Sequence, residues 1–290
     1  MTRTARLPAL LVSLPLALLA AGLPQTGATE EEEEEKEPLP LWEVGAGVAA
    51  AWTPDYPAAE DSSGRALPFP AVVYRGDFLR IGDSSVVSGR LFRSPRLELD
   101  VSLDGSLDAE SDDIDVRRGM PDLGFLFEAG PELEIVLNDP ADESRTLKLE
   151  LPLRGVFSWD DDGLRSRGLV FNPELEYETP EFAGTPWELS LSVAPVFATE
   201  KLHDYFYTVD PIYATTSRPV YEARGGYLQT EFGARLTRRD PRRFLFVGVT
   251  VNAHTGSRNE ASPLYRRDLT WAVYAGVIFA FWQSEEPAPD

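Results

Sequence analysis

The fold is indicated by residues 42–52, which read WEVGAGVAAAW. Every second residue of this stretch lies on one face of an extended strand, and that face is apolar from end to end: Trp42, Val44, Ala46, Val48, Ala50 and Trp52. A strand that crosses a bilayer needs an apolar band about 25 Å tall with aromatic residues at the two interfaces. The segment therefore predicts a strand whose outer face contacts lipid.

The same alternation recurs along the chain, and the second face of the strands is charged. Apolar faces of this kind occur at residues 97–103, 123–137, 147–153, 169–177, 187–197, 228–236 and 269–281. The opposite face carries Glu98, Asp100, Glu128, Glu150, Glu174 and Glu176. Ionised groups on strand after strand are costly inside a dry sandwich, whereas a wet or polar barrel lumen accommodates them. We predict an all-β fold, a transmembrane antiparallel up-and-down β-barrel with its polar face inward.

The connections predict the direction of the strands and their number. Long links at residues 53–66, 108–121, 159–167, 201–220 and 254–267 alternate with short ones at 138–143, 179–186 and 238–242. Outer-membrane barrels alternate long extracellular loops with short periplasmic turns in this way. Residues 69–93 are ambiguous, because they hold either three short strands or one irregular strand. The first alternative gives about 12 strands and the second 10, and both are even numbers.

The regions outside the strands divide the chain further. Residues 1–28 have Arg3 and Arg6 before an apolar stretch and small residues at its end, which is typical of a cleaved signal peptide. Residues 29–40 include a run of Glu and are expected to be an acidic, disordered tail. The barrel is expected over residues 41–282, followed by a C-terminal overhang at 283–290. No later run is apolar enough for a membrane-spanning helix, so the mature chain would enter a membrane only as a closed barrel.

Composition excludes several classes of site. The chain has no Cys and a formal net charge of −21, so we expect neither thiolate chemistry nor nucleic-acid binding. It has only two His, at positions 203 and 254, and no Ser-centred motif accompanies the neighbouring His203 and Asp204. We therefore expect no catalytic site, no metal and no cofactor.

The segment from Lys201 to Gly226 is the best candidate for a binding loop, since long loops often carry function. The candidate residues are Tyr205, Phe206, Tyr207, Pro211, Arg218, Pro219 and Tyr221. The structural alternative is favoured: these aromatic side chains would pack the loop over the barrel mouth.

Three stretches resemble the MltA-interacting protein/OmpV family of outer-membrane proteins: WTPDYP at 52–57, LPFP and YRG at 67–70 and 74–76, and YFYTVDP at 205–211 with RPVY at 218–221 and GY at 226–227. The resemblance covers about residues 41–282. It implies a non-enzymatic barrel in the cell outer membrane, in contact with its lipid. It also implies a scaffold that joins a murein-degrading lytic transglycosylase to a murein-synthesising penicillin-binding protein, with a porin-like channel or a surface adhesin as alternatives.

Overall fold

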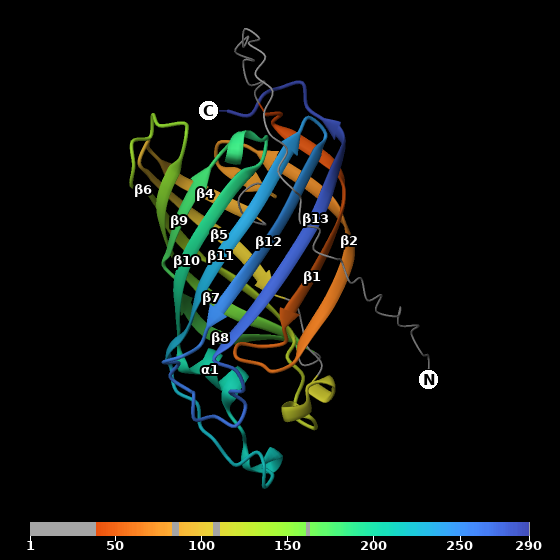
Figure 1. The fold of residues 1–290 in the computed structure, drawn as a ribbon, viewed down its shortest axis with the longest axis vertical. Coiled ribbons are helices and arrows are strands. Elements are labelled where there is room, and N and C mark those ends of the chain that lie inside the picture. The colour runs from red at the N-terminus through yellow and green to blue at the C-terminus, as the bar shows by residue number, and fades with distance from the viewer. Residues whose placement is uncertain (1–38, 83–86, 107–110, 161–162, 290) are drawn as a thin grey trace.

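The protein is a barrel of antiparallel strands that closes between its first and last strands (Figure 1). A computed structural model describes residues 39–82, 87–106, 111–160 and 163–289. The predicted signal peptide and all but the last two residues of the predicted acidic tail lie outside these ranges. Within them, each strand pairs with its neighbours in chain order, and the only departure from simple up-and-down order is at β8 and β9.

The strands have the following bounds: β1 Trp42–Pro54, β2 Ser62–Arg75, β3 Leu79–Ile81, β4 Val87–Arg93, β5 Leu97–Ser106, β6 Phe125–Val136, β7 Thr146–Asp160, β8 Gly163–Phe171, β9 Glu174–Thr179, β10 Glu188–Ala198, β11 Gly226–Asp240, β12 Arg243–Ala253 and β13 Leu269–Gln283. Because β8 and β9 pair with successive parts of the same two neighbours, β7 and β10, they form one strand interrupted at Asn172 and Pro173. The barrel thus has twelve strands, which confirms the first alternative for residues 69–93. Proline lacks an N–H for the ladder, and this explains the interruption.

The predicted division between the two faces is confirmed. Residues of the apolar face, such as Val48, Phe232 and Trp271, are exposed on the outside. Glu43, Glu176 and Ser190 on the other face are buried within the barrel. In the ladder, Val48 of β1 stands opposite Val277 of β13, so the apolar faces of the first and last strands join into one band.

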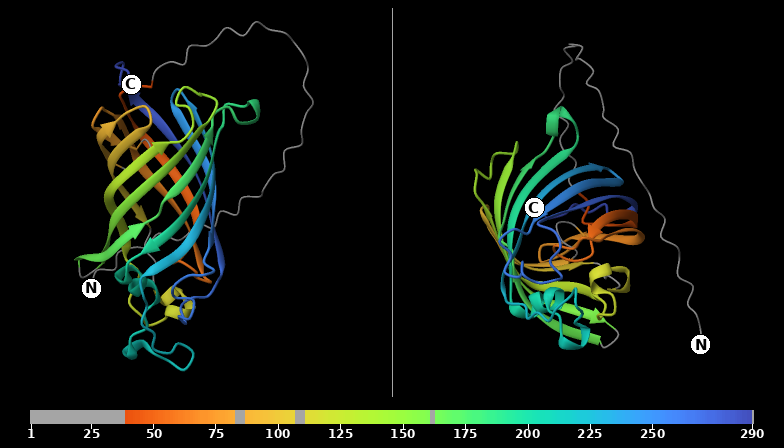
Figure 2. Two further views of the ribbon diagram at one scale, coloured as in Figure 1. Left: turned by 90° about the vertical axis from the view of Figure 1, so that its left-hand side faces the viewer. Right: turned by 60° about the horizontal axis from the view of Figure 1, so that its bottom comes forward.

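The two ends of the barrel differ. Both described termini lie at one end, here called the terminal end, where the links between strands are short (Figures 1 and 2). The opposite end, called the loop end, carries the links 107–124, 199–225 and 254–268. This is the alternation predicted from the sequence.

The candidate binding loop contains the helix α1, Glu200–Tyr207, and the 3-10 turn η4, Pro211–Tyr213. Three local predictions are wrong. The link predicted at 159–167 is far shorter, since β7 and β8 continue to Asp160 and from Gly163. Leu123 precedes β6 and is buried in the core rather than facing outward. Leu228 does not face outward. The register of β10 with β11 shifts beside it, and the side chain is buried.

Residues 284–289 do not extend away from the barrel. The amide of Leu41 donates to the carbonyl of Glu286 at 2.8 Å, and the amide of Ala288 donates to Leu39 at 2.7 Å. Pro40 and Pro287 form a β-bridge between them. The last residues therefore continue the pairing of β13 with β1. Among the helices of the described residues, none is long and apolar enough to cross a membrane.

Candidate functional site: the loop cap, the lumen and the terminal rim

The loops at the loop end share one hydrophobic core. We call residues 55–61, 111–124, 199–225 and 254–268 the loop cap. Its buried apolar side chains are Tyr56, Ala59, Ile114, Leu123, Leu202, Phe206, Tyr207, Val209, Ala223 and Leu264. They pack against buried residues of the strands below, such as Leu126, Val156 and Val196. Apolar side chains of the strands face the lipid, and the lumen is polar. The water-excluded core of the protein therefore lies where the loops meet.

Hydrogen bonds tie together loops that lie up to four strands apart around the barrel. The Tyr207 hydroxyl donates to the Pro57 carbonyl at 2.9 Å, which joins the loop after β10 to the loop after β1. The Tyr56 hydroxyl donates to the Leu264 carbonyl at 2.6 Å. Arg117 donates to the Phe206 carbonyl at 3.2 Å. The loop cap therefore spans the mouth as one packed unit.

Both histidines are structural members of the loop cap. His203 is fully buried, with Nε2 3.1 Å from the Gly226 carbonyl and Nδ1 2.8 Å from the Asn259 amide nitrogen. Nε2 therefore carries the proton, and Nδ1 accepts. Burial lowers the pKa of His203. Burial also lowers the pKa of His254 to about 4, so both rings are neutral near pH 7. Within the described ranges, neither ring forms a hydrogen bond with a Ser or Asp side chain.

The aromatic candidates of the predicted binding loop lie within the loop cap. Tyr207 and Phe206 are buried in its core. The Tyr205 hydroxyl donates to the Gly124 carbonyl at 3.2 Å, and the guanidinium of Arg167 lies 4.1 Å from the Tyr205 ring centre. The Tyr221 hydroxyl donates to Asn259 at 3.1 Å. These contacts are the ones expected if the aromatic side chains pack the loop over the barrel mouth, which was the alternative to a binding role.

The remaining candidates surround the tip of the loop. Arg218 donates to the carbonyls of Val116 and Tyr213, at 2.7 Å each, and holds the tip against the loop after β5. Pro211 and Pro219 are exposed. Ile212 is 82% exposed, so the tip presents an apolar side chain to its surroundings. A binding role for this loop stays a prediction. The side chains free to contact a partner are those of the tip, Pro211, Ile212 and Pro219.

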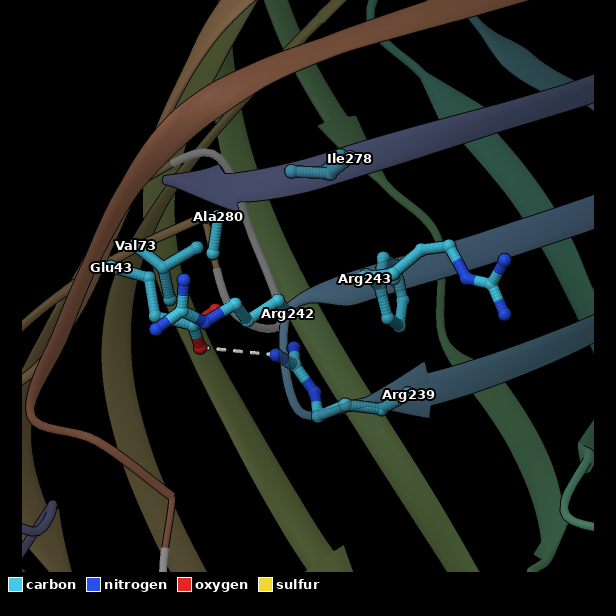
Figure 3. A pocket seen from close by; sticks show the side chains of 9 residues that line it. Glu43, Val73, Arg239, Arg242, Arg243, Ile278 and Ala280 are labelled. Atoms are coloured by element: carbon cyan, nitrogen blue, oxygen red, sulfur yellow. Dashed lines mark hydrogen bonds and ion pairs between the residues drawn. The ribbon is translucent and has the colours of Figure 1, made fainter. Parts of the chain in front are cut away.

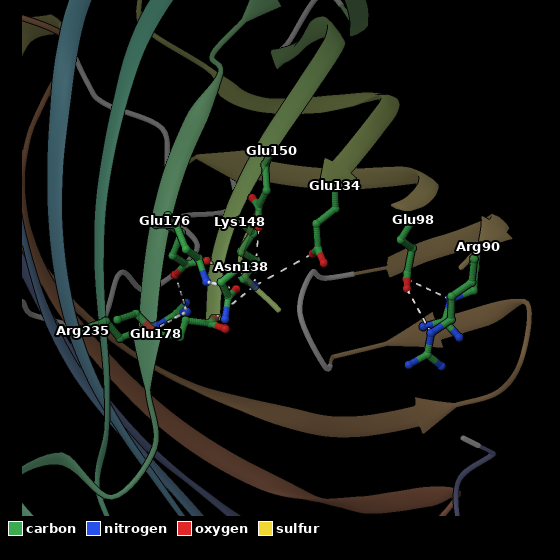
Figure 4. A network of polar contacts seen from close by, with 12 residues as sticks. Arg90, Glu98, Glu134, Asn138, Lys148, Glu150, Glu176, Glu178 and Arg235 are labelled. Atoms are coloured by element: carbon green, nitrogen blue, oxygen red, sulfur yellow. Dashed lines mark hydrogen bonds and ion pairs between the residues drawn. The ribbon is translucent and has the colours of Figure 1, made fainter. Parts of the chain in front are cut away.

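The lumen is braced by ion pairs between neighbouring strands (Figure 4). Lys148 of β7 lies 3.1 Å from Glu178, 3.3 Å from Glu176, 3.6 Å from Glu150 and 3.9 Å from Glu134. Other pairs in the lumen join Arg235 to Glu176, Arg154 to Glu132, and Arg90 to Glu98. The carboxylates predicted to line the lumen are thus matched in part by basic residues on adjacent strands.

One group of lumen carboxylates has the spacing of a cation site. Oxygens of Glu150, Glu174 and Glu176 lie within 4.8 Å of one another, and among the described residues this is the one group of that kind. Lys148 and Arg235 already neutralise part of its charge. We assign no metal to it.

The terminal rim carries a basic turn between β11 and β12 (Figure 3). Arg239 pairs with Glu43 at 3.1 Å, and Arg243 pairs with Asp240 in the same turn. Arg242 is exposed and has no carboxylate partner in the part of the chain that the structure describes. In a chain with a net charge of −21 this turn is a local positive surface. The spacing RRDPRR at 238–243 was the sequence signal for it.

The family model of the MltA-interacting protein MipA matches residues 46–281. The chain belongs to the MipA family. The match covers nearly all of the barrel, and the lipid-facing band and the alternating link lengths are those of an outer-membrane protein. The loop end of this MipA-family barrel therefore faces outward, and its terminal end faces the periplasm.

Solved structures of outer-membrane barrels are similar to this MipA-family chain at low identity. The NanC porin has 8% identity and a TM-score of 0.39, with 81% of this chain and 100% of the porin covered. An outer-membrane channel from Pseudomonas putida F1 has 13% identity and a TM-score of 0.37, with 88% and 100% covered. Outer-membrane phospholipase A from Escherichia coli has 15% identity and a TM-score of 0.35, with 86% and 94% covered. No curated protein sequence matches the chain.

Proposed function

We propose that this protein is a non-enzymatic scaffold of the outer membrane that brings a lytic transglycosylase and a penicillin-binding protein together at its periplasmic rim. The observation that carries the proposal is the loop cap, whose shared core bridges the mouth of the barrel. A packed core across the mouth restricts the passage of solutes through the barrel, so it favours a scaffold over an open pore.

The basic turn is the surface on that rim that best suits a protein partner. Arg side chains are enriched at protein interfaces, and Arg242 is exposed and has no ion pair within the described chain. Its neighbours Arg239 and Arg243 are held by Glu43 and Asp240, so the turn has a fixed shape before any partner binds.

The proposal is tested by affinity capture of purified lytic transglycosylase and penicillin-binding protein on the folded barrel in detergent. We expect Arg242→Glu to reduce capture at least tenfold, because it replaces attraction by repulsion at the rim. Arg224→Glu, at an exposed arginine of the outer loops, is the matched control and should leave capture unchanged. Failure of the unaltered barrel to capture either enzyme would overturn the proposal.

A cation-selective pore is the second candidate, and the excess of lumen carboxylates favours it. Glu98, Asp100 and Glu174 face the lumen, and a hollow of about 420 Å³ opens beside Glu98 and Glu134 at the periplasmic rim. Planar-bilayer recordings distinguish the two candidates. A scaffold with its mouth bridged gives no stable unitary current, whereas an open lumen gives a cation-selective one.

A further inference from the structure

The acidic tail joins the barrel beside the basic turn. Leu39 and Pro40 are the first residues that the structure describes, and they lie at the terminal rim just before β1. The Pro40 carbonyl accepts a hydrogen bond from Nη1 of Arg75 at 2.8 Å. Nη2 of Arg75 lies 2.7 Å from Oε1 of Glu43, and Nη1 of Arg239 lies 3.1 Å from the same oxygen (Figure 3). Direct contacts therefore lead from the end of the tail to the basic turn.

The basic turn keeps positive charge that its own carboxylate does not match. Arg238 and Arg243 both pair with Asp240, so one carboxylate faces two guanidinium groups. Arg242 lies beside them, exposed and with no carboxylate partner within the described ranges. The Arg242 carbonyl accepts a hydrogen bond from the Ala280 amide at 2.9 Å, which fixes the turn against β13. The turn thus presents an anchored cation to the periplasm.

The sequence of the tail supplies the opposite charge. Residues 30–35 are all Glu, and Lys36 and Glu37 follow. Charges of opposite sign attract across a water-exposed rim, and salt screens the attraction. Because the tail is covalently tethered, its effective concentration at the rim is in the millimolar range, so weak contacts suffice to hold it there.

The tail is also long enough to reach the turn. The tail continues into β1, the turn joins β11 to β12, and β13 alone separates β1 from β12. Two strand spacings amount to about 10 Å across the rim. Residues 30–37 extend over as much as about 27 Å. The reach of the tail therefore exceeds the distance that it has to cover.

We propose that residues 30–37 dock on the basic turn and cover Arg242 when no partner is bound. The docking itself needs no partner. Its consequence rests on the proposed scaffold function: the docked tail occupies the surface assigned to the partner enzymes, so a partner has to displace it. The tail is then an internal competitor, and it favours partners whose negative surface binds the turn more strongly than the tail does.

The absence of cysteine allows a test with a single spin label. Glu33→Cys carries a nitroxide in the middle of the acidic run. The labelled full chain is purified from outer membranes, and heat-modifiable migration confirms that it is folded in detergent. We expect a slow component in its electron paramagnetic resonance spectrum at low salt. Arg242→Glu should reduce this component about fivefold, and about 0.5 M salt should reduce it similarly without any change in the turn.

Arg96→Glu is the matched control. Arg96 is exposed at the same rim, in the turn between β4 and β5, and it too has no carboxylate partner within the described ranges. Its substitution should leave the slow component unchanged. A label that moves freely in the unaltered protein, or a slow component that Arg242→Glu leaves intact, would overturn the proposal. So would a mature chain that begins after Glu37, as measured by mass spectrometry.

The effect on partners is measured separately. Replacement of residues 30–35 by Gln should raise capture of the murein enzymes about fivefold, because the competitor loses its charge. Capture that occurs but is unchanged by this replacement would show that the tail does not compete, and would overturn the inference. If the unaltered barrel captures neither enzyme, the scaffold proposal fails, and the spectra alone still decide whether the tail docks.

Discussion

Acid should weaken the loop cap through His254. This side chain is fully buried, its Nε2 accepts a hydrogen bond from the Ala58 amide at 3.2 Å, and the Thr270 hydroxyl lies 2.9 Å from the same atom. Its Nδ1 is buried with no hydrogen-bond partner among the described residues. A proton added to the ring would therefore place a charge where few groups solvate it. Burial lowers the pKa of His254 from 6.5 to about 4.

The sign of the effect follows from linkage. In the opened loop the imidazole has its ordinary pKa and takes up a proton first as the pH falls, so the packed loop loses stability between pH 6.5 and about 4. At 1.36 kcal/mol per pKa unit the full loss is about 3 kcal/mol, or about three hundredfold in the opening equilibrium, and at pH 4.5 about a hundredfold of it is reached. Above pH 6.5 the ring is neutral in both states, and its titration contributes nothing further.

The assay is hydrogen exchange of residues 254–268, corrected for the intrinsic exchange rate, at about pH 7 and about pH 4.5. Protection of this loop should fall about a hundredfold in acid, while the strands keep theirs. His254→Gln keeps an acceptor near the position of Nε2 and removes the titration, so its loop should lose much less. Parallel losses in the variant and the unaltered protein would refute the reasoning.

Three further perturbations have defined outcomes. Lys148→Met leaves four carboxylates without their shared cation and should destabilise the barrel by about 3–5 kcal/mol in denaturant unfolding, whereas the exposed Lys201→Met should be neutral. Tyr207→Ala removes a fully buried ring and should cost the loop cap about 3–5 kcal/mol, measured as faster proteolysis of the outer loops; unchanged cleavage would contradict the packing described. Val48→Arg puts a charge at the middle of a lipid-facing strand and should cost about 2–4 kcal/mol of folding free energy in vesicles, and a neutral result would contradict the assignment of that face.

The barrel was predictable from the sequence because two environments impose a period of two on every strand. Hydrocarbon accepts only apolar side chains, and the enclosed lumen accepts charges. The alternation in WEVGAGVAAAW at 42–52 therefore indicates a strand with one face toward lipid and the other toward the lumen. The even strand number followed from the alternation of long and short links. The ambiguity at 69–93 had a physical cause: β3 is only three residues long, too short to show a period.

The loop cap and the ion pairs were not predictable in the same way. The period of a strand gives its faces but not its register, and a slip along the neighbour changes which residues meet. Glu134 and Glu176 reach Lys148 only in the register that β6, β7 and β9 adopt. The helix α1 has eight residues, too few for a clear period, and its aromatic residues fit a packed cap and a binding loop equally well. Leu228 was misplaced by a single extra residue in β11, which carries no sequence signal of its own.

The loop cap and the periplasmic rim together determine how the lumen meets its surroundings. The outer mouth is bridged by a core that includes Tyr207 and Leu264, so access from outside requires that core to open. The hollow beside Glu134 opens at the periplasmic rim. Opening of the loop cap in acid would join the outer surface to the lumen, so the pH dependence of His254 tests whether the loop cap closes the outer mouth.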